Sequence, residues 1–150
     1  MSIDNSKIRK IILVEHEGLR INIRAIEGLL DAVEAGDVHA RESAHQQLNA
    51  MLQSFLRHIE HEERLLQPVL AAIDAWGPQR SAAMTEEHKL QRAQVMQLTS
   101  VDPAEDPKAW ARDVRLFAKD VLLDMIDEEK TCLSPNVLRD DVVVVDGTSE

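Results

Sequence analysis

The sequence predicts an all-α protein, an antiparallel up-down-up-down four-helix bundle with a short C-terminal tail. Apolar residues recur every three or four positions along four long stretches, which is the spacing of one buried helix face. Glycine and proline are scarce, at five each in 150 residues, so few positions interrupt those stretches. The connections between the stretches are short, and short connections favour helices that pack beside one another in opposite directions.

The first helix is expected to begin near Asp4 or Ser6, either of which can cap it, and to end at about Ala35, before Gly36-Asp37. Its apolar positions are Ile8, Ile12, Leu19, Ile23, Ile26, Leu30 and Val33. His16 lies on the same stripe, four residues after the second of these positions and three before the third. We therefore expect the imidazole of His16 to point into the bundle.

The second helix is expected to start after Asp37 and to reach Gln67, where Pro68 ends it, with a brief continuation over residues 69–75 as an alternative. His58 and Glu62 lie one turn apart on its apolar stripe. Carboxylates are almost never buried without a partner, because desolvating the charge is expensive. An inward imidazole and an inward carboxylate together predict a shared metal ion.

The third helix should run from Gly77-Pro78 to about Leu98, with His88 on its inward stripe. After a polar loop over residues 99–107, the fourth helix should run from about Lys108 to Leu133. Its stripe consists of Trp110, Val114, Phe117, Val121, Met125 and Glu129. The bundle domain is thus predicted to span residues 1–138, and residues 139–150 have no place in it and are predicted to form the tail.

Residues 58–68 and 125–135 can be aligned without a gap. In both stretches a carboxylate follows the first position by four residues, and a proline follows it by ten. Bundles that hold two metal ions commonly supply ligands from paired helices in this way. The symmetry is incomplete, because Met125 stands where the first copy has His58.

The combination of one inward histidine on the first helix, His-x-x-x-Glu on the second, one inward histidine on the third and a glutamate before a proline on the fourth resembles the hemerythrin family, in its HHE cation-binding branch. The resemblance covers about residues 7–138. It implies a four-helix bundle with a non-haem di-iron centre. Proteins of that family bind oxygen, respond to oxygen, iron or nitric oxide, or act in the repair of iron–sulfur damage.

Carried over by position, the resemblance implies that His16 and His58 ligate one iron ion, that Glu62 and Glu129 bridge two ions, and that His88 ligates the second. The fourth-helix histidine of the family is replaced by Met125, whose thioether is a poor ligand for iron. We therefore expect a weakened or single-metal site. Another acid, Glu128 or Asp124, could compensate, and the sequence does not choose between them.

Composition narrows the remaining possibilities. The formal charge of −10 argues against nucleic acid as a partner. No apolar run approaches the ~20 residues that a membrane span needs, and no signal peptide is visible. The single cysteine, Cys132, fits a reducing cytoplasm and is predicted to be a buried, inert thiol. The absence of a nucleophile with a histidine at an interpretable spacing, and of a glycine-rich phosphate loop, makes an enzyme the less favoured interpretation.

Three functions remain open at this point. The first is an iron protein that binds or senses a small diatomic ligand, oxygen or nitric oxide. The second is a stress-repair or iron-handling protein that uses the same site. The third is a metal-free bundle that serves as a regulatory or interaction module, with the acidic surface or the tail binding a partner protein.

Overall fold

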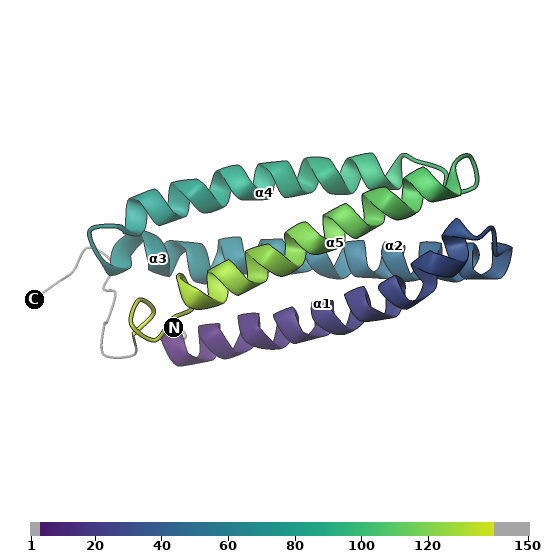
Figure 1. Cartoon of the computed structure of the whole chain (residues 1–150). Helices are drawn as coiled ribbons and strands as arrows, with labels where there is room; N and C mark the ends of the chain where they lie inside the picture. The colour runs from purple at the N-terminus through teal and green to yellow at the C-terminus, as the bar shows by residue number, and fades with distance from the viewer. Residues whose placement is uncertain (1–3, 140–150) are drawn as a thin grey trace, which may run out of the picture.

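The computed structural model describes residues 4–139 of the chain. Four long helices run alternately up and down and form a four-helix bundle, as predicted (Figure 1). A short π-helix, η1, and a short α-helix, α3, extend the second long helix. Residues 4–139 contain no strand, and no helix among them is both long and apolar enough to cross a membrane. The elements in order are α1 (Asn5–Glu34), α2 (Val38–His61), η1 (Glu62–Leu66), α3 (Gln67–Ile73), α4 (Gly77–Thr99) and α5 (Pro107–Lys130).

Aspartates cap three of the four long helices. The side chain of Asp4 accepts a hydrogen bond from the backbone N–H of Lys7 at 2.8 Å, and Asp37 accepts one from Ala40 at 3.0 Å. Asp106 accepts one from the backbone N–H of Ala109 at 3.1 Å. Between α1 and α2, Gly36 adopts a φ of +93°, a conformation that side chains with a Cβ rarely adopt. The predicted starts of the first two helices therefore agree with the structure.

The second helix does not end at Pro68. Its α-helical segment ends at His61, and the five-residue η1 follows, in which the backbone N–H of Gln67 donates to the carbonyl of Glu62. This wider turn continues into α3, where Pro68 occupies the first turn. Pro68 lies where the π pattern of η1 changes to the α pattern of α3, so the missing N–H falls at a break in the regular hydrogen-bond ladder, where it costs less. The brief continuation beyond Pro68 is thus present, and the wide turn that carries it was not predicted.

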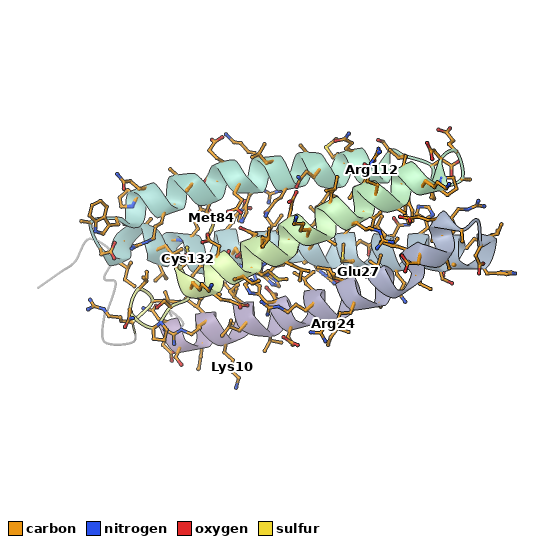
Figure 2. The ribbon with its side chains drawn as sticks, viewed as in Figure 1. Lys10, Arg24, Glu27, Met84, Arg112 and Cys132 are labelled. Atoms are coloured by element: carbon orange, nitrogen blue, oxygen red, sulfur yellow. The ribbon has the colours of Figure 1, made fainter. Side chains whose placement is uncertain are left out.

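Two apolar clusters lie along the bundle with a layer of buried polar side chains between them. The larger cluster includes Leu19, Ile59, Val95 and Met125. The smaller one includes Ile12, Leu66, Met84 and Leu133. On each long helix, or on its extension, a polar residue lies between members of the two clusters: His16, Glu62, His88 and Glu128. Met84 and Cys132 both lie toward the end of the bundle formed by the smaller cluster (Figure 2).

The chain after α5 packs against the start of α1. Leu133 and Leu138 are buried in the smaller cluster. The side-chain amide of Asn5 donates to the carbonyl of Arg139 at 2.7 Å, and Arg9 donates to the carbonyl of Leu133 at 3.0 Å. The fourth helix therefore ends earlier than predicted, at Lys130. Apart from Arg139, the predicted tail of residues 139–150 lies outside the described residues.

Candidate metal centre

Four buried side chains converge in the polar layer and are called the inner group here. His16 comes from α1, His58 from α2, Glu62 from the start of η1 and Glu128 from the last turn of α5. One potential ligand atom from each of them lies within 4.8 Å of those of the others. The rings of His16 and His58 meet edge to face, with their centroids 4.9 Å apart. Three separate stretches of the chain thus supply one compact group of donors.

The contacts within the inner group leave one atom without a partner. Nε2 of His16 lies 3.0 Å from Oε1 of Glu128, and Nε2 of His58 lies 3.4 Å from Oε1 of Glu62. The second carboxyl oxygen of Glu62 is buried and accepts no hydrogen bond from a donor among the described residues. A buried polar atom without a partner is costly. Its presence in a group of imidazoles and carboxylates is the observation that points to a cation.

The electrostatics of the inner group also favour a cation. Burial raises the pKa of the Glu62 carboxyl well above its usual range, and the neighbouring Glu128 raises it further. Burial alone would raise the pKa of Glu128, but hydrogen bonds with Glu62 and His16 lower it overall. Two carboxyl groups side by side in a buried site cannot both ionise freely without a positive partner. Two imidazoles and two carboxylates suit a divalent transition-metal ion such as iron, manganese or zinc, so the residues present fit a metal.

His88 lies beside the inner group without belonging to it. It is buried on α4, and its Nε2 lies 3.1 Å from Oε1 of Glu62. Glu62 is thus approached from two sides, by His58 and by His88. Further acids lie near Glu62: the charges of Asp124 and Glu87 add to the rise in its pKa, and burial and a hydrogen bond with Asp124 raise the pKa of Glu87 to about 8.

The carboxylate that α5 contributes to the inner group is Glu128, not Glu129, the residue predicted from the sequence. Glu128 is buried, but the side chain of Glu129 is 26% exposed and accepts two hydrogen bonds from Nη2 of Arg20, at 2.9 and 2.8 Å. The reason is helical phase. Glu128 follows Trp110 by 18 residues, which is five full turns at 3.6 residues per turn, so the two side chains share one direction. Glu129 lies about 100° away from that direction.

A second layer of carboxylates, called the outer carboxylates here, holds the other nitrogen of each inward histidine. Nδ1 of His16 lies 2.7 Å from Glu129, Nδ1 of His58 lies 2.9 Å from Glu15, and Nδ1 of His88 lies 2.9 Å from Glu63. Neither Glu15 nor Glu63 is among the site residues predicted from the sequence. Glu15 directly precedes His16, and Glu63 directly follows Glu62. Each therefore lies at the edge of the apolar stripe of its helix.

The outer carboxylates have positive or hydrogen-bonding partners of their own, and these favour the ionised form. Hydrogen bonds from Arg92 and His88 lower the pKa of Glu63 to about 2. Burial alone would raise the pKa of Glu129, but His16 and Arg20 lower it overall. Glu15 behaves in the same way, with His58 and His61 as the groups that lower its pKa. Each outer carboxylate is therefore suited to accept a proton-bearing nitrogen of a histidine.

The remaining histidines and the residue that replaces the expected fourth-helix ligand lie elsewhere. His39 is exposed, and His45 packs edge to face against Trp110, with ring centroids 6.1 Å apart. His61 is partly buried and hydrogen-bonds Glu15. Met125 is buried in the larger apolar cluster, where a flexible thioether packs well.

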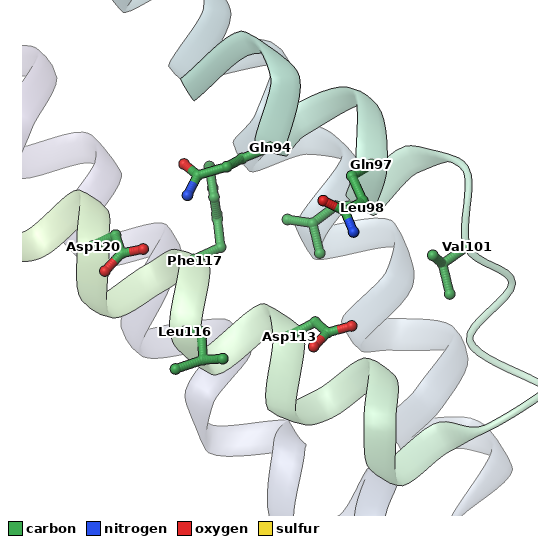
Figure 3. Close-up of a pocket in the computed structure, with 8 residues that line it drawn as sticks. All are labelled: Gln94, Gln97, Leu98, Val101, Asp113, Leu116, Phe117 and Asp120. Carbon is green, nitrogen blue, oxygen red and sulfur yellow. The ribbon is translucent and has the colours of Figure 1, made fainter. Parts of the chain in front are cut away.

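Cys132 is half-buried, and burial raises the pKa of its thiol. A pocket of about 240 Å³ lies elsewhere, between α4 and α5 (Figure 3). Gln94 and Gln97 line one side of it, and Phe117 and Asp120 line the other. Because its lining contains no imidazole, this pocket is not part of the candidate metal centre.

Comparison with known proteins identifies a family for nearly the whole chain. The family model described as the hemerythrin HHE cation-binding domain matches residues 7–136. This range contains every residue of the inner group and all of the four long helices except the first two residues of α1. No significant match was found among curated proteins or among solved structures.

Proposed function

We propose, from the premise that this chain belongs to the hemerythrin HHE cation-binding domain family, that it holds non-haem iron in the inner group and binds a small diatomic ligand there. The observation that carries the proposal is the convergence of two imidazoles and two carboxylates in a buried layer, where one oxygen of Glu62 accepts no hydrogen bond from a donor among the described residues. Burial of such a group in an apolar interior is costly, and a cation that binds all four side chains offsets this cost.

The proposed ligands are His16, His58, Glu62 and Glu128. Two histidines with a carboxylate are the donors of mononuclear iron sites that keep open coordination positions. When bound, the iron supplies a redox-active centre at which a small molecule can coordinate. The protein residues hold that centre and keep bulk water away, because all four are buried.

We propose a single ion rather than the pair that the family resemblance implies. His88 reaches Glu62 but stands outside the inner group, and Met125 offers only a thioether within an apolar cluster. A second ion on this side would therefore have one imidazole and shared carboxylates as its protein ligands. That set is weaker than the one formed by the inner group.

The surroundings favour a small and neutral ligand. Along the axis of the bundle, the inner group has the larger apolar cluster on one side and the smaller apolar cluster on the other. Transfer of a large polar or charged molecule into such a site would be costly. Oxygen and nitric oxide are small, carry no charge and coordinate iron, so we propose them as the ligand class.

Iron content and the visible spectrum test this function together. We expect the full chain, purified after expression in iron-replete medium, to contain about one iron ion per chain, and its spectrum to change on exposure to oxygen or nitric oxide. His58→Ala should abolish iron binding while leaving the helical circular dichroism intact. His39→Ala is the matched control, because His39 is an exposed residue of the same helix.

Two results would contradict the proposal. Wild-type protein without iron, or His58→Ala protein that retains it, would exclude the inner group as the site. Iron-loaded protein whose spectrum responds to neither gas would retain the metal site but exclude the diatomic ligand.

A further inference from the structure

We infer that Glu15 and Glu129 are positioning residues, each of which holds Nδ1 of a proposed ligand histidine so that Nε2 faces the cation, and that Glu63 holds Nδ1 of His88 in the same way so that Nε2 faces Glu62. The inference rests on the proposed metal site and assigns a role that the family match does not give. It also gives Glu129 a role other than that of a ligand.

The same arrangement occurs three times, on three different helices. In each case Nε2 of the histidine points to a buried carboxylate: His16 to Glu128 at 3.0 Å, and His58 and His88 to Glu62 at 3.4 and 3.1 Å. In each case Nδ1 points the opposite way, to an outer carboxylate at 2.7–2.9 Å. Three independent imidazoles thus share one orientation relative to the polar layer.

Each outer carboxylate also contacts a second side chain, in addition to the inward histidine. Arg20 contacts both oxygens of Glu129 at 2.9 and 2.8 Å, and Arg92 contacts both oxygens of Glu63 at 2.7 Å. His61 hydrogen-bonds Glu15. A contact with both oxygens of a carboxylate restricts its rotation, so the oxygen that accepts from the histidine has a defined position.

The chemical consequence concerns the position of the imidazole proton. A neutral imidazole carries one N–H, and an ionised carboxylate can only accept a hydrogen bond. Once the buried carboxylate beside Nε2 binds the cation, the outer carboxylate beside Nδ1 is the acceptor that remains, so the proton stays on Nδ1 and the lone pair of Nε2 is available to a metal. The same hydrogen bond prevents the ring from turning away from the site.

Exposure separates the two kinds of carboxylate. The side chains of the outer carboxylates are 22–32% exposed, whereas those of Glu62 and Glu128 are 3% and 8% exposed. The outer carboxylates are therefore at the rim of the bundle, where water and the arginines can stabilise their charge. Glu62 and Glu128 have no contact with an arginine among the described residues and little exposure to water. We infer that the cation neutralises their charge.

The test compares Glu129→Leu, which removes the acceptor, with Glu129→Gln, which keeps an acceptor oxygen. With Zn²⁺ as the probe and a competing chelator, Glu129→Leu should bind about 10–100-fold more weakly than wild type, and Glu129→Gln should recover part of the loss. Glu17→Leu is the matched control, because Glu17 also lies near Arg20, at 3.7 Å, but has no contact with an imidazole.

A second measurement detects a change that a merely structural role would not cause. In Zn²⁺-loaded protein with ¹⁵N-labelled histidine, the Nδ1–H signal of His16 should be present in wild type and be shifted or lost in Glu129→Leu. Unchanged affinity together with an unchanged His16 signal would overturn the inference. A Co²⁺ spectrum altered in Glu129→Gln to the same extent as in Glu128→Gln would also overturn it, because Glu129 would then be a ligand.

These outcomes differ from those that test the proposed function. If the wild-type chain binds neither iron nor Zn²⁺, the metal site is excluded and the positioning role falls with it. If the wild-type chain binds metal and the outer-carboxylate variants match it in affinity and signal, only the positioning role is excluded.

Discussion

Glu62 is the residue at which the requirements of folding and of metal binding conflict most directly. Its carboxyl is buried, lies beside Glu128, and has one oxygen without a hydrogen-bond partner among the described residues. Without a cation, burial and the nearby negative charge disfavour the ionised form, which is why its pKa is raised. The residue therefore reduces the stability of the metal-free protein and provides a donor to the metal-bound one.

The substitution Glu62→Gln tests this conflict. The folded-state pKa of Glu62 is raised above the ordinary value of 4.5. As the pH rises above that value, the unfolded chain releases a proton that the folded chain retains, so the free energy of unfolding of wild type falls. The free energy of unfolding of the variant does not fall in this way, because glutamine does not titrate. At neutral pH we expect metal-free Glu62→Gln to be more stable than wild type by about 1 kcal/mol or more.

Chemical denaturation of both metal-free proteins at pH 4 and pH 7 measures the difference. The advantage of the variant should be larger at pH 7, and Glu60→Gln, an exposed change on the same helix, should show none. An equal difference at both pH values would contradict the prediction. With metal added, the order should reverse, because the variant loses a charged ligand.

At the level of the elements, η1 carries a proposed ligand and an outer carboxylate in one wide turn. Glu62 contributes to the inner group, while the next residue, Glu63, holds His88 and is fixed by Arg92. π-Helical turns arise when one extra residue is accommodated in an α-helix, and they occur frequently at functional sites. The extra residue changes the angle between successive side chains without changing the direction of the helices on either side.

Deletion of Arg64, an exposed residue of η1, should convert the wide turn into a regular α-helix. We expect the bundle to fold, because α2 and α3 keep their facing residues. The affinity for Zn²⁺ should fall by about tenfold or more, since both a ligand and an outer carboxylate change direction. Arg64→Ala is the control that leaves the turn intact. Equal affinities of the deletion variant and Arg64→Ala would show that the wide turn does not matter for the site.

Across the whole molecule, the inner group links segments that are distant in the sequence. Its residues come from α1, from the end of α2 with η1, and from α5. A metal that binds only when these segments are assembled stabilises the folded state, because unfolding would separate its ligands. Metal binding and the stability of the bundle should therefore be coupled.

Thermal denaturation measures this coupling. With free Zn²⁺ or Fe²⁺ at 100 times its dissociation constant, the folded state should gain about 2.7 kcal/mol. For a domain of this size the corresponding rise in Tm is about 5–10 °C. A chelator should reverse the rise, and His58→Ala should show none. A wild-type Tm that does not respond to metal would contradict the coupling.

Much of the architecture was predictable from local patterns. The caps at Asp4 and Asp37 and the periodic apolar stripes define where the helices start and which face they bury. The same periodicity placed the side chains of His16, His58, Glu62 and His88 on inward faces, and the structure buries all four. These features depend on residues that are close together in the sequence. The starts of the helices and their buried faces can therefore be predicted from the sequence of one chain.

Other features were decided only by the tertiary structure. Glu128 and Glu129 are neighbours in the sequence and both lie near the inward face of α5, and the packing of α1 against α5 determines that Glu128 joins the inner group while Glu129 contacts Arg20 and the other nitrogen of His16. The wide turn before Pro68 depends on the packing of residues on both sides of it. The partners of Glu15, Glu63 and Glu129 come mostly from other helices. The sequence alone thus determined which faces are apolar and which polar side chains lie on them. Which of those side chains meet was determined by how the helices pack, because contacts between helices depend on their rotation and relative position, which no local pattern specifies.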